Sequence, residues 1–313
     1  MTVLVPITYK GGIYRHDDII ELIEDLGGYI VQKHVLAQEV VLQSFVPRDD
    51  VEQIRRIAKP LAGEVKESPL VGTEIAVISP SLEIHHLPHT SCDIAEYLRQ
   101  AGAKTNMVGL ARGFGKRIAN LNREERDVIN EHDLAVYVLG NFAECIEHKF
   151  PVLQRGIEVP IVITGAPDRE TLQKIVDPPV DGYVGGIGRI MHRFRRPEEL
   201  AKLDELVAEV ARVLDARREV LANDPLSIFP ARLKDVIEEK VYEVATLTHP
   251  TPVTVQMTGV RVKLPYDDYA PEFRALEIQD GVAIGDIAEV LPSRMRNYII
   301  IRIKPYSETG VMV

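Results

Sequence analysis

The amino-acid sequence predicts an α/β protein with several domains, and three observations indicate this class. The chain has 313 residues, enough for two or three domains at ~150 residues per domain. Its first 68 residues read in the order strand, helix, strand, strand, helix, strand. Residues 69–196 then alternate short apolar runs, rich in β-branched residues, with helical segments. This alternation is typical of a parallel sheet whose strands are joined by crossover helices.

The predicted N-terminal domain spans residues 1–68. Residues 2–8 alternate in polarity as a strand does, and residues 17–28 place apolar side chains on one face of a helix that ends at two glycines. Two strands with a turn near residues 34–38 follow, and then a helix over 48–59 and a short final strand. This order matches the ferredoxin-like fold, a common docking and regulatory module that carries no function by itself.

The central part, residues 69–196, is predicted to form a Rossmann-like α/β domain. Ligands on such parallel sheets bind at the loops beyond the carboxyl ends of the strands. These loops are expected at residues 79–92, 111–122, 140–145, 165–168 and 185–196. Both cysteines and four of the nine histidines fall in or beside them, namely Cys92, Cys145, His85, His86, His89 and His192. We therefore expect a functional site at this edge of the sheet.

Two further parts complete the chain. Residues 197–223 read as a long amphipathic helix whose apolar residues recur at spacings of three and four: Leu200, Leu203, Val207, Val210 and Leu214. Such a seam can belong to a coiled coil, but over three heptads it more often marks a helix packed on its own domain or on a partner. Residues 224–313 are predicted to form a small α+β domain, which begins with a linker at 224–230 and has strands over 253–265 and 296–305.

The composition excludes several classes of protein. Lys and Arg number 37 against 47 Asp and Glu, a net charge of −10, so general binding to nucleic acid or to an anionic membrane is not expected. No apolar run approaches the ~20 residues of a membrane span, and the amino terminus lacks the layout of a signal peptide. Two cysteines without a CxxC spacing fit a reducing cytoplasm.

The stretch HHLPHTSC concentrates metal-binding side chains. It contains His85, His86, His89 and Cys92 within eight residues, and imidazole and thiolate are good ligands for borderline and soft transition metals. Thr90 or the serine after it can cap the helix that follows, so that Cys92 lies in the first turn, where the helix dipole favours a thiolate. The simpler alternative is a linker with two solvated histidines and a buried cysteine.

The glycine-rich segment GLARGFGKR follows a predicted strand. Backbone N–H groups near Gly113 and Gly115, with the charges of Lys116 and Arg117, could bind phosphate, another anion or a partner. The spacing does not match a Walker A motif. A plain connecting loop remains the alternative.

Residues 185–196 hold the densest basic cluster of this acidic chain. Its arginines could clamp an anion or dock an acidic partner, or they could simply form a solvated helix end. They are Arg189, Arg193, Arg195 and Arg196.

Several motifs together resemble a known family. The segments HLPHTSCDIAEYLRQAG, GLARGFGKR, EHDLAVYVLGN and VPIVITG are similar to the shared core of methyl-coenzyme M reductase operon protein C and its relatives. The whole chain, from MTVLVPITYKGG to YIIIRIKPYSETGVMV, resembles the methanogenesis marker protein 7 family. The resemblance therefore covers the full length.

This resemblance implies an archaeal, cytoplasmic, non-catalytic subunit that takes part in the ATP-dependent activation of methyl-coenzyme M reductase. The nickel tetrapyrrole of that enzyme works as Ni(I) and has to be re-reduced by accessory proteins. The implied partners are the reductase, operon protein C, other methanogenesis marker proteins and an ABC-type ATPase. The implied cofactor is a complex iron–sulfur cluster, similar to a nitrogenase-cofactor precursor, that carries electrons.

The resemblance also ranks the site residues. Cys92 matches the cysteine of the family core, and His86 matches a histidine six residues before it. His89 and Cys145 have no matching position and stay candidates from local chemistry, while His85 is expected to be a spacer. Two cysteines cannot form a four-thiolate cage. Any cluster would therefore be shared with a partner subunit, use imidazole ligands or carry few protein ligands, and of these we expect sharing. The shortage of thiolates fits equally well a chain that binds no cluster.

Two other functions fit the same residues. The chain could be a small-molecule enzyme in which Cys92 is the nucleophile and GLARGFGKR holds an anion. It could also be a purely structural scaffold of the same complex, with Cys92 buried and inert.

Overall fold

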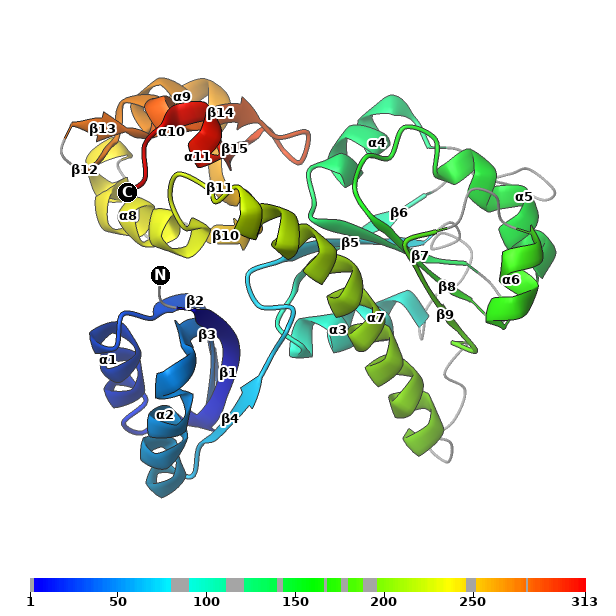
Figure 1. Ribbon diagram of the computed structural model, residues 1–313, viewed down its shortest axis with the longest axis horizontal. Helices are drawn as coiled ribbons and strands as arrows, with labels where there is room; N and C mark the ends of the chain where they lie inside the picture. Colours follow the sequence, from blue (N-terminus) through cyan, green and yellow to red (C-terminus); the bar gives the residue numbers. More distant parts are fainter. Residues whose placement is uncertain are drawn as a thin grey trace. The chain divides into compact units, whose positions relative to one another are not determined.

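The computed structural model describes nine segments of the chain, which form two compact units. The described residues are 3–79, 90–110, 121–139, 143–165, 168–175, 180–187, 196–245, 252–279 and 281–313. The first unit comprises residues 1–73, 101–103 and 221–313, and the second comprises 74–100 and 104–220. Figure 1 colours the chain from its N-terminus in blue to its C-terminus in red. Parallel and antiparallel sheets covered by helices confirm the predicted α/β class.

The N-terminal part of the first unit is a four-stranded antiparallel sheet with two helices. Its strand order is β2-β3-β1-β4, the order of a ferredoxin-like fold. Side chains at alternate positions of β1, such as Ile7 and Tyr9, meet Ile19 and Ile23 of α1 in one core. The elements are β1 (Leu4–Gly12), α1 (Asp17–Asp25), β2 (Tyr29–Leu36), β3 (Glu39–Pro47), α2 (Val51–Ala58) and β4 (Glu64–Glu67), with short 3₁₀ turns at Arg48–Asp50 and Lys59–Leu61.

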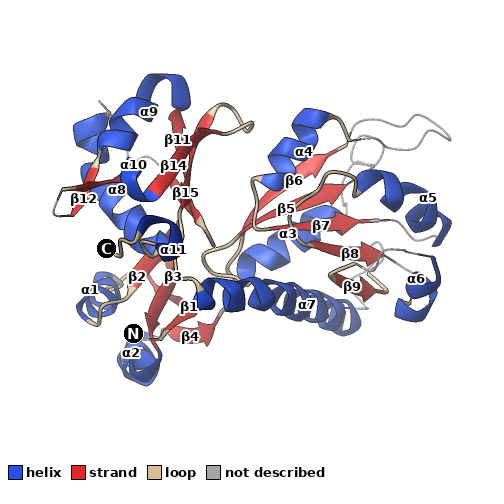
Figure 2. Ribbon diagram, turned by 45° about the horizontal axis from the view of Figure 1, so that its top comes forward, coloured by secondary structure: helices blue, strands red, loops and turns tan. Residues whose placement is uncertain are grey.

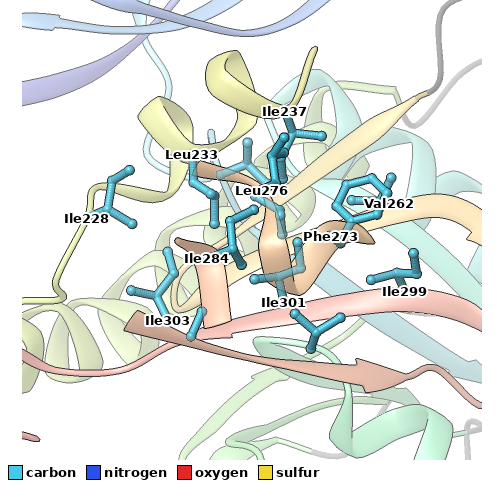
Figure 3. Close-up of a cluster of buried hydrophobic side chains, with 14 of the residues drawn as sticks. Ile228, Leu233, Ile237, Val262, Phe273, Leu276, Ile284, Ile299, Ile301 and Ile303 are labelled. Atoms are coloured by element: carbon cyan, nitrogen blue, oxygen red, sulfur yellow. The ribbon is translucent and has the colours of Figure 1, made fainter. Parts of the chain in front are cut away.

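The C-terminal part of the first unit has a second antiparallel sheet, ordered β10-β11-β15-β14. Its core joins Val262, Ile299 and Ile301 of the sheet to Phe273 of α9 and Ile237 of α8 (Figure 3). The elements are α8 (Pro230–Val244), β10 (Val253–Gln256), β11 (Gly259–Pro265), α9 (Tyr266–Ala275), β12 (Glu277–Gln279), β13 (Val282–Ala283), α10 (Ile284–Ile287), β14 (Ala288–Pro292), β15 (Tyr298–Ile303) and α11 (Tyr306–Thr309).

The structure corrects two expectations in this region. Residues 253–265 form a hairpin of two strands rather than one strand. The segment 224–230, expected to be a linker, is packed into the core: Ile228 is buried, and the backbone N–H of Ser227 donates to the carbonyl of Lys304 at 3.0 Å. Phe229 also packs against the ring of Phe45, so these residues join the C-terminal part to the ferredoxin-like sheet.

The second unit is built on a five-stranded parallel sheet with the order β6-β5-β7-β8-β9, whose strands lie side by side in Figure 2. The order reverses direction between β5 and β7, which is the topological switch point where ligands bind on sheets of this kind. The elements are β5 (Glu74–Ser79), α3 (Thr90–Gln100), β6 (Lys104–Gly109), α4 (Arg123–Asn130), β7 (Leu134–Val138), α5 (Ala143–Leu153), β8 (Ile161–Gly165), α6 (Arg169–Ile175), β9 (Gly182–Gly185) and α7 (Arg196–Asn223).

Helices cover both faces of this sheet. One face buries Ala76, Ile78 and Tyr137 against α4, α5 and α6, with the Tyr137 ring edge-on to Phe150. Helices α3 and α7 lie on the other face (Figure 1). The neutral form of Tyr137 is strongly favoured, because burial raises the pKa of its hydroxyl.

Helix α7 packs its apolar seam on its own unit, as one of the interpretations of the sequence expects. Leu203, Val210 and Leu214 are buried, whereas Leu200, near the start of the helix, is 42% exposed. The guanidinium of Arg217 donates to the carbonyl of Asp133, just before β7, at 3.2 Å. In the described part of the chain, no helix is both long and apolar enough to cross a membrane.

Candidate functional site

Helix α3 places Cys92 at the carboxyl edge of the parallel sheet. The helix follows β5 in the chain, so its first turn lies beyond the end of that strand. Thr90 is the first residue of the helix rather than its cap, so Cys92 is the third helical residue. Cys92 is a free cysteine and partly exposed, which differs from the buried, inert thiol of the scaffold alternative. Among the described residues, Cys92 therefore keeps part of its surface exposed at this edge of the sheet.

The residues around Cys92 hold this turn in place. Ser91, Ile94, Ala95 and Leu98 are buried, so the helix presses one face onto the sheet. Thr105 of β6 fastens that face, because its hydroxyl donates to the carbonyl of Ala95 at 3.2 Å. Cys92 therefore projects from a helix whose position is fixed by packing.

The second cysteine comes to the same edge on a different helix. Cys145 is the third residue of α5, which follows β7, and β7 is the neighbour of β5 across the switch point. Helix α5 contributes to the core on the face opposite α3. The side chain of Cys145 lies outside the description.

The remaining predicted site residues fall outside the described residues. These are the three histidines His85, His86 and His89, and the loop residues Gly113, Gly115, Lys116 and Arg117. The same holds for His192, Arg189, Arg193 and Arg195, and for the side chain of Arg196, the first residue of α7. Each of these segments follows a strand of the parallel sheet in the chain.

The described residues do not by themselves complete a metal site. Among them, no group of three or more His, Cys, Asp and Glu side chains could hold a metal ion. Cys92 does fit an iron ligand by its chemistry, since it is a partly exposed thiol in the first turn of a helix. This part of the chain therefore offers one thiol, to which other ligands would have to be added.

A buried polar network lies at the opposite, amino edge of the same sheet, and its extent is not evident from the sequence. The amide of Asn106 donates to Glu74 Oε1 at 2.6 Å and lies 3.0 Å from His132 Nε2. His132 Nδ1 lies 2.8 Å from the carbonyl of Val128. Because a carbonyl only accepts, Nδ1 carries the proton and Nε2 accepts from the amide. Asp133 Oδ2 accepts from the backbone N–H of Glu74 at 2.8 Å.

This network supports the structural role expected for His132. The histidine is almost fully buried, and both of its ring nitrogens lie at hydrogen-bond distance from the carbonyl of Val128 and the amide of Asn106. The network anchors the starts of β5 and β7 to each other. The one signal in the sequence was the run of polar residues, EHD, directly before an apolar strand.

No described tyrosine near the carboxyl edge supplies a proton at neutral pH. Burial and the nearby charge of Asp168 raise the pKa of Tyr183 to about 12. Asp168 itself has a pKa below its ordinary value, because the backbone N–H of Thr171 donates to its carboxylate at 2.7 Å. Asp168 thus caps the start of α6 through this bond.

Comparison with known proteins gives one family. The family described as methyl-coenzyme M reductase operon protein C matches residues 4–276. An uncharacterized protein of Methanocaldococcus jannaschii is 45% identical over 302 residues, which cover 96% of this chain and 94% of that protein. The methyl-coenzyme M reductase I operon protein C of the same organism is 29% identical over 113 residues, which cover 32% of this chain and 56% of that protein.

Solved structures resemble the chain only distantly. A putative CpaE2 pilus assembly protein from Sinorhizobium meliloti 1021 covers 45% of this chain and 98% of its own, with 14% identity and a TM-score of 0.25. This likeness is too distant to inform fold or function. The sequence match spans both structural units instead. The chain therefore belongs to the methyl-coenzyme M reductase operon protein C family.

Proposed function

We propose that this chain is an accessory subunit of the machinery that activates methyl-coenzyme M reductase. Its family ties it to the reductase system of methanogenesis. Within that system, the proposed role is to hold or shield an iron–sulfur cluster at an interface with a partner subunit. When bound, such a cluster would supply the electrons that reduce the nickel tetrapyrrole to Ni(I).

The observation that carries this proposal is the position of Cys92. Its thiol is partly exposed in the first turn of α3, at the edge of a parallel sheet where ligands bind. Buried neighbours in the same helix hold this turn in position. Binding of iron to the thiol would therefore not require the helix to move.

The number of thiols supports sharing the cluster with a partner. The chain has two cysteines, and the second lies in the first turn of a helix that covers the other face of the sheet. Cys92 would therefore supply one thiolate, with His86 and His89 as further ligands. Operon protein C, other methanogenesis marker proteins and an ABC-type ATPase are the proposed partners, and no enzymatic turnover is assigned to this chain.

Anaerobic co-purification with these partners tests the proposal. Iron and sulfide are measured per complex for the wild type, Cys92→Ala and Cys92→Ser, and we expect both variants to lose iron while the partners remain bound. Ser91→Ala, in the same helical turn, is the matched control and should keep its iron. Full iron content in an intact complex of Cys92→Ala would refute the cluster role and favour a scaffold. Turnover of a small substrate by the isolated chain would favour an enzyme.

A further inference from the structure

Two buried hydroxyl groups lie at the carboxyl edge of the parallel sheet. Ser79 is the last residue of β5, and Thr164 is the next-to-last residue of β8. Both residues have no exposed surface. In the part of the chain that the structure describes, neither Ser79 Oγ nor Thr164 Oγ1 has a hydrogen-bond partner. A buried hydroxyl without a partner destabilises a fold, so two of them at one edge call for an explanation.

The strand register puts the two hydroxyls in one row. Thr164 pairs with Val138 of β7, and β5 pairs with β7 in register up to Ile78 and Tyr137. The next row therefore places Ser79 on the other side of Val138. Partners in a parallel sheet project to the same face, so Ser79 and Thr164 flank Val138 on one face, about 10 Å apart across two strand spacings.

This face is the one that α3 and α7 cover. Ile78, the residue before Ser79, projects into the core beneath α4, α5 and α6, so Ser79 projects to the opposite side. Helix α3 begins at the same edge, directly after the segment that follows β5. Its start adds a partial positive charge, which favours anions.

The strand order also points to the carboxyl edge near Ser79 as a binding site. Ser79 ends β5, and Val138 ends β7, so they flank the switch point of the sheet. Sheets of this strand order bind ligands in the crevice at that point. The hydroxyl of Ser79 thus lies at the switch point, where sheets of this kind bind their ligands.

Unpartnered hydroxyls elsewhere in the described residues do not form such a row. The hydroxyl oxygens of Thr8 and Ser44 in the ferredoxin-like sheet are also buried without a partner. Their strands pair Thr8 with Gln43 and Ile7 with Ser44, so the two side chains project to opposite faces. The shared row in the parallel sheet is therefore distinct from these scattered hydroxyls.

We infer that this edge binds a phosphorylated small molecule of the nucleotide or sugar-phosphate class. The phosphate would lie at the start of α3 beside Ser79, and a hydroxyl of the sugar would reach Thr164. A single phosphate cannot contact both side chains across about 10 Å, whereas a phosphate joined to a sugar approaches that span. The partly buried Val138 between them offers an apolar contact for the sugar. The inference uses the hydroxyls and not the thiol of Cys92, so it stands apart from the cluster role.

Calorimetry on the full chain tests this inference with three probes: ADP, ribose 5-phosphate and inorganic phosphate. We expect Ser79→Ala to weaken all three at least five-fold, and Thr164→Val to weaken ADP and ribose 5-phosphate but not inorganic phosphate. Ser44→Ala removes an equally buried, unpartnered hydroxyl in the other unit and is the control, which should bind as the wild type does. Cys92→Ala should also bind normally, so failure here is distinguishable from failure of the cluster role.

A second readout needs no variant. Hydrogen exchange on the wild-type chain should show that ADP protects the backbone amides at the start of α3, residues 90–95. The inference is wrong if the wild type binds none of the three probes, or if Ser79→Ala and Thr164→Val bind like the wild type. It is also wrong if both variants gain stability with no change in binding, because the hydroxyls would then be unsatisfied groups of the sheet that no ligand contacts.

Discussion

The hydroxyl of Tyr97 on α3 donates a 2.5 Å hydrogen bond to Oδ1 of Asp204 on α7. This bond joins the two helices that cover the face on which Ser79 and Thr164 project. Burial and the bond to Asp204 raise the pKa of Tyr97 to about 12. The helix that presents Cys92 is thus tied to the longest helix of the same unit.

Removing this bond should weaken the second unit by a small amount. For Tyr97→Phe we expect a loss of about 1 kcal/mol in the free energy of unfolding, because the bond is lost while Asp204 stays in contact with solvent. The raised pKa means that the neutral tyrosine is favoured in the folded state. Its contribution is complete below pH 10 and disappears as the pH rises through about 12.

Denaturant melts between pH 8 and pH 12 would measure this effect, with Asp204→Asn and the double variant completing a cycle. The wild type and Tyr97→Phe should converge at the alkaline end of that range. A gap that persists at the highest pH would show that the phenol stabilises the helix pair by packing and not by its proton.

Asp235 on α8 should make the first unit more stable in mild acid. Burial raises the pKa of its carboxyl to about 6, and the negative charges of Glu238 and Glu24 act in the same direction against the charge of Lys234. Folding therefore favours the protonated acid. This stabilisation is complete below about pH 4, the usual range of the carboxyl in an unfolded chain, and is lost as the pH rises through about 6.

Asp235→Asn should therefore be more stable than the wild type at pH 7 and equal to it near pH 4. The side chain is 46% exposed, so solvent screening keeps the gain below ~1 kcal/mol. Lys234 keeps its 2.5 Å ion pair with Glu238 in this variant. Thermal melts at the two pH values measure the difference, and equal stability at pH 7 would contradict the prediction.

Mutation of the buried network at the amino edge should cost more stability than removing the Tyr97 hydroxyl or the Asp235 charge. Asn106→Ala removes the donor that meets both Glu74 and His132. Because Glu74 is 1% exposed, water cannot replace the lost bond, and we expect a loss of about 2–3 kcal/mol. Asn130→Ala removes a partly exposed asparagine that bonds the backbone of Gly156 and Glu158. This control should cost less, and equal losses would mean that burial does not set the effect.

Alanine substitutions at two glycines should distinguish the cost of backbone strain from the cost of a steric clash. Gly27 has φ +77° with open space around a would-be Cβ, whereas Gly102 has φ +109° with the Val71 backbone nitrogen 2.7 Å from that position. We expect Gly27→Ala to cost about 1–2 kcal/mol through backbone strain alone. Gly102→Ala should cost clearly more, because Val71 would have to move. Urea unfolding of both variants measures the difference, and similar midpoints would contradict it.

The sequence predicts the strands of the parallel sheet better than the C-terminal elements that pack on other parts of the chain. Apolar runs marked all five strands of the parallel sheet, because strands covered on both faces are almost continuously hydrophobic. Helix α8 was missed because its buried positions, such as Ile237, are interrupted by charged residues. The segment around Ile228 looked like a linker because Asp and Pro also mark turns. The structure of both segments depends on their packing against the sheets, which the local sequence does not show.

Part of the candidate site could likewise be predicted from the sequence, and part could not. The sequence places Cys92 in the first turn of a helix, since a run of Thr and Ser before an apolar pattern marks a helix start. It errs by one residue in the cap, because Thr90 is already helical. It gives no sign of Ser79 and Thr164, because a shared row depends on strand register and on which strands are neighbours. Such pairings appear only once the sheet is assembled.

Chemical labelling of Cys92 links its exposure to its proposed role. In the isolated, folded chain we expect a maleimide to modify Cys92, because the residue is partly exposed. Assembly with operon protein C and the other partners under anaerobic conditions should protect the thiol at least ten-fold in rate, since a bound iron or a covering subunit would block the sulfur. Mass spectrometry of the peptide that contains α3 measures the modification, and the denatured chain, in which Cys145 also reacts, gives full labelling. Protection that persists after iron is removed by a chelator would assign it to the partner surface. If Cys92 reacts as fast in the assembled complex as in the free chain, it is neither a cluster ligand nor an interface residue.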